Sequence, residues 1–153
     1  MKRDFSDFIL SQLVELKSIL EYWETNTQDF AHEGFVGRID SKGVVEAQAS
    51  KGAVLNARIL WTFSAAFNFS KEEKHLKMAE RAFNYFVKHF VDAENGGVYW
   101  ELDYTGKPLN TRKQTYAQGF AVYGLSEYYR ATGNAESLEL AQKLYFDMEK
   151  HCF

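Results

Sequence analysis

The chain is poor in cysteine, in proline and in net charge. Its one cysteine, Cys152, has no second cysteine with which to form an internal disulfide, which agrees with a reducing compartment. The net charge of the 153 residues is only -3, and acidic and basic residues are interspersed. A nucleic-acid-binding protein needs a basic patch or stripe, so we expect no nucleic acid or other polyanion as a partner.

Targeting and membrane-spanning segments are also missing from the sequence. The start, MKRDFSDFIL, has charges among its apolar residues in place of the apolar run and cleavage site of a signal peptide. Residues 53–69 are apolar, but about 17 residues is short for a bilayer span. Arg58 near the centre of this run would cost about 2.5–3.5 kcal/mol on insertion. We therefore predict a cytoplasmic protein without a membrane partner, in which this run is a buried helix.

This apolar stretch, Lys51 to Phe69, is the segment around which the rest of the chain is organised. Its apolar residues cover nearly the whole circumference of a helix, so the helix should be buried on most sides. They are Val54, Leu55, Ile59, Leu60, Trp61, Phe63, Ala65, Ala66 and Phe67. A buried Arg58 requires a polar partner. Lys51, Arg58 and Thr62 share one stripe of this helix, which predicts that the stripe lines a wet cavity.

Helical periodicity predicts four further helices. They cover residues 6–23, residues 70–91 behind a capping box formed by Ser70 and Glu73, residues 112–131, and the stretch from Asn134 to the end. Gly133 should stop the third of these, and Asn134 should cap the last. The period disappears in residues 25–50 and 92–111. There GFVGRIDSKGVV and NGGVYWELDYTGKPLN, the latter with the only proline, Pro108, indicate strand, turn and strand.

The chain repeats itself at a period of about 62 residues. In the strand pairs, Gly34, Ile39, Asp40 and Gly43 match Gly97, Leu102, Asp103 and Gly106. In the first helix of each unit, Lys51, Trp61, Ser64 and Phe67 match Lys113, Tyr123, Ser126 and Tyr129. In the second helix, Ala79, Phe83, Lys88 and His89 match Ala141, Tyr145, Lys150 and His151. The repeat predicts another strand pair at the point where the sequence ends. We therefore expect a truncated array, because a complete ring would need six units, roughly 370 residues.

Five segments together resemble the amino-terminal portion of the N-acylglucosamine 2-epimerase family. They are GFVGRID, KGAVLNARILWTFSAAF, GGVYWELDYTGKP, KQTYAQGFAVYGLSEYYRATG and KLYFDMEKH, nearly the whole chain from about Gly34 onward. The resemblance implies an all-α fold in which helical hairpin repeats form part of an (α/α)6 barrel. Short β-hairpins would lie in the long loops from outer to inner helices, over a central active site. Residues 1–153 would be the leading helix and the first two repeats, a truncated single domain.

The resemblance also implies a reaction, the inversion of carbon 2 in the reducing-end glucose of a β-1,4-linked disaccharide such as cellobiose. The product is glucosyl-mannose, and the proton is removed and returned through an enediolate without any metal, nucleotide or other cofactor. Arg58 aligns with the family's arginine, whose cation would stabilise the oxyanion. Tyr116 and Phe120 align with residues that line the sugar cavity. A disaccharide or monosaccharide is therefore the expected ligand.

The sequence departs from the family in its histidines. The family's acid/base pair is two histidines, which with their supporting glutamate would lie beyond residue 153. His75, His89 and His151 fall on predicted outer helices and His32 in a loop, where solvated or capping roles are expected. We therefore expect the isolated chain to be inactive. Its exposed barrel edges should favour self-association.

Two other functional classes remain open at this point. Glu101 and Asp103 lie two apart and would form a carboxylate pair in a fragment of an (α/α)6 glycoside hydrolase or lyase, although a solvated hairpin edge explains them more simply. A helical-repeat binding module without chemistry is the third class. The aromatic residues that could stack on a sugar, most of which we assign to the core, are Trp61, Trp100, Tyr116 and Tyr123. No Gly-rich phosphate loop, metal-spaced His/Cys set or Ser-His-Asp order is found in the sequence.

Overall fold

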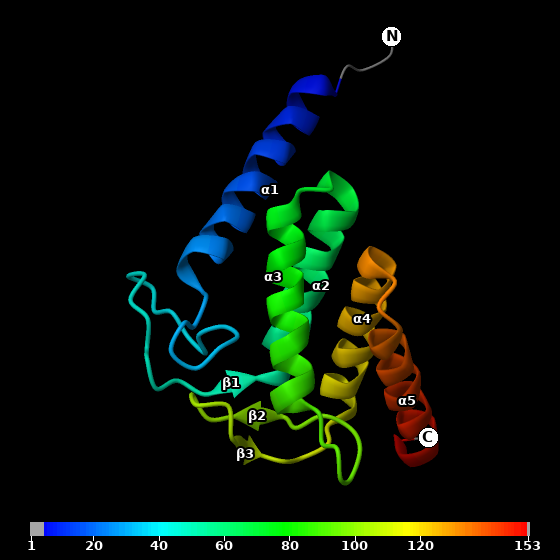
Figure 1. Ribbon diagram of the computed structural model, residues 1–153. Helices are drawn as coiled ribbons and strands as arrows, with labels where there is room; N and C mark the ends of the chain where they lie inside the picture. The colour runs from blue at the N-terminus through cyan, green and yellow to red at the C-terminus, as the bar shows by residue number, and fades with distance from the viewer. Residues whose placement is uncertain (1–4, 153) are drawn as a thin grey trace.

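The helices form a two-layered arrangement with a small sheet at one end (Figure 1). This computed structural model describes residues 5–152, and residues 1–4 and the side chain of Cys152 lie outside the described part. The elements are α1 (Ser6–Asn26), β1 (Lys51–Gly52), α2 (Ala53–Ser70), α3 (Glu73–Tyr85), the π-helix η1 (Phe86–Phe90), β2 (Glu101–Leu102), β3 (Pro108–Asn110), α4 (Thr115–Thr132) and α5 (Ala135–Cys152). None of the described helices is long and apolar enough to cross a bilayer.

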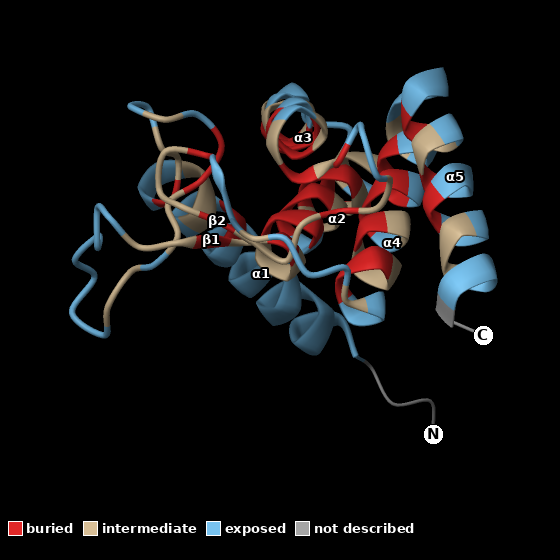
Figure 2. Ribbon diagram, turned by 90° about the horizontal axis from the view of Figure 1, so that it is seen from below, coloured by how far each residue is buried: buried red, intermediate tan, exposed pale blue. Residues whose placement is uncertain are grey.

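Inner and outer helices alternate along the chain, as the repeat predicts. Helices α2 and α4 pack side by side, α3 covers α2, and α5 covers α4 (Figure 2). The two inner helices approach closely at Gly124, where an added Cβ would lie 2.6 Å from the carbonyl oxygen of Ala57. The core therefore sits between the layers, and most of the ribbon coloured red for buried residues in Figure 2 belongs to α2, α3 and α4.

The predicted burial of α2 on most sides is confirmed only in part, since Val54, Leu55, Trp61, Ala65 and Phe67 are only half-buried, and it is wrong for Arg58. The buried residues of α2 are Ala53, Asn56, Ala57, Ile59, Leu60, Phe63, Ser64 and Ala66. Arg58 is exposed, because neither α3 nor α4 covers its side of the helix. The guanidinium therefore needs no buried partner.

The predicted stripe of Lys51, Arg58 and Thr62 is also wrong, because Lys51 precedes the helix. Lys51 is in β1, where it pairs with Leu102 of β2, and the next residue, Gly52, is extended with ψ 140°. Its side chain is 1% exposed and places Nζ 2.8 Å from Oδ2 of Asp29. Lys51 thus ties a loop to the start of α2, and only Arg58 and Thr62 share a cavity.

Helix boundaries follow the predictions to within a few residues, and the two predicted helix caps, at Ser70 and Asn134, have different outcomes. The Ser70–Glu73 capping box does not form, because α3 begins at Glu73 without a side-chain cap. Ser70 Oγ accepts from the N–H of Glu72 at 3.2 Å, donates to the carbonyl oxygen of Ala66 and contacts His75. Asn134, by contrast, caps α5 by accepting from the N–H of Ser137 at 2.9 Å. Helix α4 begins at Thr115, three residues later than predicted.

The two Asp-x-x-Gly turns confirm the repeat at the level of single hydrogen bonds. Gly43 N–H donates to the Asp40 carbonyl at 3.0 Å, and Gly106 N–H donates to the Asp103 carbonyl at 3.1 Å. Both glycines have positive φ, +80° and +93°, where a side chain is unfavourable. The flanking strands differ, because β2 and β3 form a ladder, whereas residues 34–45 contribute only two isolated bridges, Phe35 with Gln28 and Ile39 with Val45.

Helix α1 is the least buried of the described helices. Leu20 is its one buried residue, and most of its apolar side chains are exposed in the described chain, including Phe8, Ile9, Leu13 and Leu16. Figure 1 shows that α1 leans away from the other helices. A large exposed apolar surface of this kind marks an interaction site.

Candidate functional site

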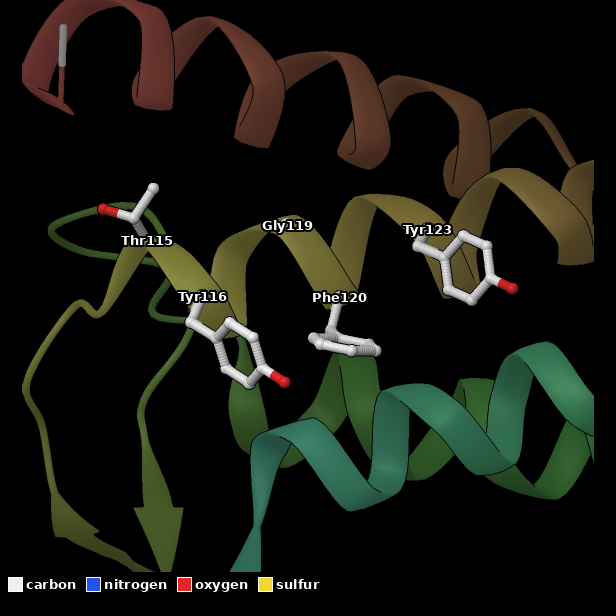
Figure 3. Close-up of a pocket in the computed structure, with 5 residues that line it drawn as sticks. All are labelled: Thr115, Tyr116, Gly119, Phe120 and Tyr123. Carbon is white, nitrogen blue, oxygen red and sulfur yellow. The ribbon is translucent and has the colours of Figure 1, made fainter.

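Three aromatic rings on α4 line an open cavity of about 640 Å³, here called the aromatic cavity. Its lining residues are Thr115, Tyr116, Gly119, Phe120 and Tyr123. Tyr116, Phe120 and Tyr123 are four and three residues apart, so they project from one side of the helix. Figure 3 shows the three rings on this side, while Thr115 points away from them. The two residues predicted to line the sugar site, Tyr116 and Phe120, are therefore brought together.

The rings form a continuous row that reaches from α4 to α2. Tyr116 and Phe120 meet edge to face with centroids 4.9 Å apart, and Phe120 contacts Tyr123 in the same way at 6.3 Å. Tyr123 then stacks on Trp61 of α2, with an interplanar angle of 11° at 4.9 Å. The tyrosine rings are not core, since Tyr116 is 63% and Tyr123 45% exposed. Exposed ring faces and hydroxyl groups are available for a ligand with both apolar and polar surfaces.

Arg58 lies next to this row. It is three residues before Trp61, so the two side chains are neighbours on the surface of α2. Arg58 of the first repeat corresponds to Phe120 of the second repeat, which follows it by 62 residues. Arg58 does not line the aromatic cavity, however, but a cavity of about 230 Å³ with Thr62 and with Trp23 of α1.

No other described residue neutralises Arg58. Within residues 5–152 no hydrogen bond or ion pair engages its guanidinium, whereas the lysines before the two inner helices, Lys51 and Lys113, are paired with Asp29 and Asp92. An unpaired, exposed guanidinium keeps five N–H donors for a ligand. Arg58 is thus the cation next to the aromatic row that is free to bind an oxyanion.

Two side chains at the start of α4 hold the loop between η1 and β2. Lys113 Nζ lies 2.8 Å from Oδ2 of Asp92, and its hydrogen bond holds the pKa of Asp92 far below the ordinary value. Gln118 donates to the Val98 carbonyl at 2.9 Å and accepts from the Val98 N–H at 2.8 Å. These contacts fix the loop against the first turn of α4.

The first repeat contains the same lysine clamp, which sequence reasoning missed. Lys51 contacts Asp29 at 2.8 Å as Lys113 contacts Asp92, and each aspartate also accepts two backbone N–H groups of its own turn through Oδ1. The signal was present, since Asp29 and Asp92 are 63 residues apart, close to the period of the repeat. Both clamps lie at the end of the molecule where α2 and α4 begin.

The two carboxylates considered for glycoside hydrolysis serve the hairpin. Glu101 accepts a hydrogen bond from Ser50 Oγ. Asp103 lies in the turn after β2 and accepts from the hydroxyl and N–H of Thr105 and from the N–H of Lys107. The hydrogen bond from Thr105 is the main reason that the pKa of Asp103 is lowered. Neither side chain lines the aromatic cavity, so the structure offers no support for the carboxylate pair.

The four histidines lie away from the aromatic cavity and from the cavity of Arg58. His32 contacts the edge of Tyr104 from its loop. His75 is buried on α3, and burial lowers its pKa. His89 at the end of η1 contacts a backbone carbonyl, and His151 is exposed on the last turn of α5. Among the residues that the structure describes, no three His, Cys, Asp or Glu side chains converge to hold a metal ion.

Comparison with known proteins gives consistent matches over most of the chain. The family model described as N-acylglucosamine 2-epimerase (GlcNAc 2-epimerase) matches residues 34–153. Cellobiose 2-epimerase of Bacteroides fragilis is 52% identical over 135 residues, which are 88% of this chain and 34% of the relative. Cellobiose 2-epimerase of Dictyoglomus turgidum is 40% identical over 134 residues, again 88% of this chain and 34% of the relative. The chain thus spans about a third of the length of these curated relatives.

Solved structures agree in fold. Cellobiose 2-epimerase from Spirochaeta thermophila has a TM-score of 0.88 at 32% identity, over 97% of this chain and 38% of that one. The enzyme from Bacillus thermoamylovorans has a TM-score of 0.85 at 37% identity, over 91% of this chain and 37% of that one. These are (α/α)6 barrels, so the predicted fold class is confirmed. A family 76 glycoside hydrolase, at 19% identity and a TM-score of 0.72, is similar in fold alone.

Proposed function

Because this chain belongs to the N-acylglucosamine 2-epimerase family, we propose that it supplies the Arg58 side of the active site of a cellobiose 2-epimerase. Residues 1–153 are the leading helix and the first two repeats of the barrel in this proposal. The observation that carries it is the unpaired Arg58 beside an exposed aromatic row, in a chain 52% identical to the cellobiose 2-epimerase of Bacteroides fragilis. The proposed location is the cytoplasm.

Arg58 acts on the charge that develops during the reaction. Removing the proton at carbon 2 of the ring-opened sugar leaves an enediolate, whose negative charge develops on the oxygen of carbon 1, next to the hydroxyl oxygen of carbon 2. The guanidinium is protonated at every accessible pH, so it donates to these oxygens without taking part in proton transfer. A positioned donor of this kind contributes about 10²–10³-fold to the rate of such reactions.

The aromatic row binds and orients the sugar. Tyr116 and Phe120 offer ring faces to the apolar C–H side of a pyranose, and the hydroxyl of Tyr116 offers a polar contact at the same place. Because the rings already contact one another, little side-chain freedom is lost when a sugar binds. The row thus fixes the disaccharide relative to Arg58.

The acid/base pair comes from residues outside this sequence. Epimerisation requires proton transfer on both faces of the enediolate, and each acid or base contributes about 10²–10⁴-fold. The histidines of this chain are placed in a loop, in a helix interior and at helix ends, away from both cavities. The proposal is therefore that these 153 residues bind the substrate side but do not epimerise it on their own.

An NMR titration of the ¹⁵N/¹³C-labelled chain with cellobiose tests the substrate assignment. We expect shifts at millimolar sugar that are confined to the rings of Tyr116, Phe120 and Tyr123 and to Nε–H of Arg58. The variant Tyr116→Ala should weaken them several-fold, and maltose, with its α-1,4 linkage, is the control ligand. Shifts that are equal for both sugars, or that lie away from these residues, contradict the assignment.

A further inference from the structure

The turn between η1 and β2 contains the only Asn-Gly pair of the sequence, Asn95 and Gly96. Asparagine is thermally labile, because the backbone nitrogen of the next residue can attack the amide carbon of its side chain. Glycine has no Cβ, so its nitrogen is the least hindered nucleophile for this attack. Every other asparagine precedes a residue with a side chain; these are Asn26, Asn56, Asn68, Asn84, Asn110 and Asn134.

The side chain of Asn95 is held loosely beside Asp92. Its Nδ2 lies 3.3 Å and 3.5 Å from the two carboxylate oxygens of Asp92, which is long for a hydrogen bond. The N–H of Gly96 donates to the Asp92 carbonyl at 2.9 Å, so this one bond must open before the nitrogen can react. The amide carbon of Asn95 and its nucleophile are therefore neighbours that only weak contacts keep apart.

We propose that Asn95 is a site of spontaneous deamidation. The nitrogen of Gly96 bonds to Cγ of Asn95, and the amide nitrogen leaves as ammonia together with the proton of the attacking nitrogen. The product is a cyclic succinimide. Water then adds to one of its two carbonyl carbons and breaks the bond from that carbon to the ring nitrogen. Breaking the bond at Cγ gives aspartate, and breaking the bond at the main-chain carbonyl gives isoaspartate.

Aspartate at position 95 weakens the clamp between Asp92 and Lys113. In the unmodified chain Asp92 accepts from the backbone N–H of Asn95 at 3.0 Å and from Nζ of Lys113 at 2.8 Å, with Nδ2 of Asn95 beside them. Deamidation replaces the Nδ2 donor by a second carboxylate. Like charges then repel at this position, and both carboxylates compete for one lysine.

Isoaspartate changes the main chain itself, because the chain then runs through the former side chain and is longer by one atom. The turn is closed by bonds from the Asp92 N–H to the Gly97 carbonyl and from the Gly96 N–H to the Asp92 carbonyl, both 2.9 Å. A Cβ added to Gly97 would lie 3.1 Å from Oε1 of Gln118, so there is little room for a displaced backbone. The modification therefore disturbs the first turn of α4, which carries Tyr116. This consequence does not depend on the proposed catalytic function.

The first repeat contains the same clamp without the labile pair. Lys51 contacts Asp29 at 2.8 Å, but the residues 63 positions before Asn95 and Gly96 are His32 and Glu33. Neither of these side chains has an amide that can leave as ammonia. The change should therefore be confined to the clamp of the second repeat.

Peptide mass spectrometry of the purified chain tests the site during storage at physiological temperature in a mildly alkaline buffer, which favours loss of the proton from the attacking nitrogen. The peptide with Asn95 should convert to a mixture of aspartate and isoaspartate. The internal control is Asn110, whose neighbour Thr111 is β-branched and hinders the attack, so Asn95 should react at least about tenfold faster. An unmodified Asn95, or an Asn110 that reacts equally fast, would overturn the proposal.

The variant Asn95→Gln separates the modification from other effects of ageing. It keeps a side-chain amide, but its longer side chain would have to close a larger and less favourable ring, so it should stay unmodified. In ¹⁵N spectra of the stored chain we expect new amide positions for Gly97, Lys113 and Gln118 and unchanged ones for Lys51. Stored Asn95→Gln should show none of these changes. If the chain deamidates at Asn95 and these three amides do not move, the proposed effect on the clamp is wrong.

Discussion

Replacing Lys51 by alanine should destabilise the fold strongly, because the Lys51 ammonium is buried against a carboxylate. Nζ lies 2.8 Å from Asp29 Oδ2 and 3.1 Å from the carbonyl oxygen of Glu33, and the side chain is 1% exposed. Breaking a buried ion pair by removing one partner costs about 3–5 kcal/mol. Asp29 is 12% exposed and keeps two backbone N–H donors, so we expect the lower end, about 3 kcal/mol.

Lys113→Ala is the matched control, since Lys113 holds Asp92 at the same 2.8 Å while its side chain is 32% exposed. Water can solvate the Asp92 carboxylate once Lys113 is removed. The free energy of unfolding should therefore fall less than half as much in Lys113→Ala as in Lys51→Ala. The assay is urea unfolding followed by circular dichroism. With a slope of about 2 kcal/mol per molar urea, the midpoint of Lys51→Ala should fall by about 1.5 M. Equal losses for the two variants would refute the argument from burial.

Two further predictions concern acid stability and helix packing. Burial by itself raises the pKa of Asp29, but the hydrogen bond from Lys51 leaves this pKa below its ordinary value. The contribution of the Lys51–Asp29 pair to the free energy of unfolding should therefore be complete above the unfolded pKa of about 4 and decline as pH falls through the folded pKa. Urea midpoints that do not fall between pH 5 and 2 contradict this. Gly124→Ala should destabilise the chain by about 1–3 kcal/mol in thermal unfolding, because its Cβ would lie 2.6 Å from the Ala57 carbonyl oxygen. Gly119→Ala, with open space at its Cβ, is the control and should be neutral or stabilising.

The sequence predicted the features that local chemistry determines. The apolar content of residues 53–69 identified α2 as a core helix, because a helix that its neighbours cover needs apolar residues on the covered sides. Aspartate and glycine at fixed spacing identified both turns, since these residues satisfy the backbone of the turn by themselves. Asn134 was predicted to cap α5 for a similar reason, because its side chain accepts from a backbone N–H of the first turn.

The features that were missed depend on contacts distant in sequence. Lys51 looked like part of the helix, but its backbone pairs with Leu102, 51 residues away, and nothing near Lys51 in sequence indicates that strand. Arg58 was expected to be buried because the apolar residues around it were assumed to be covered on every side. Ser70 was predicted to cap α3, but its hydroxyl donates to the Ala66 carbonyl and accepts from the N–H of Glu72, one residue before the helix begins.

The structure places Tyr116 and Phe120 in one cavity, and their contact with a sugar stays a prediction. The stacking of Trp61 on Tyr123 was not predicted, although the two residues hold equivalent positions in the repeats. A stacked pair across two helices depends on how closely the helices approach, which Gly124 sets. The packing of the two helices therefore determines this stacked pair, and the residue pattern of a single helix does not reveal it.

Deuterium uptake at carbon 2 of the reducing-end sugar of cellobiose, followed by NMR in heavy water, tests most directly whether Arg58 stabilises the enediolate. The samples are this 153-residue chain, a chain extended to six repeats of roughly 370 residues, and the extended chain with Arg58→Ala or, as control, Arg112→Ala. We predict uptake by the extended chain and its control, a loss of about 10²–10³-fold for Arg58→Ala, and no uptake above background by the 153 residues alone. Full activity of Arg58→Ala would contradict the role of this arginine. Uptake catalysed by the 153-residue chain would contradict the location of the acid/base pair outside it.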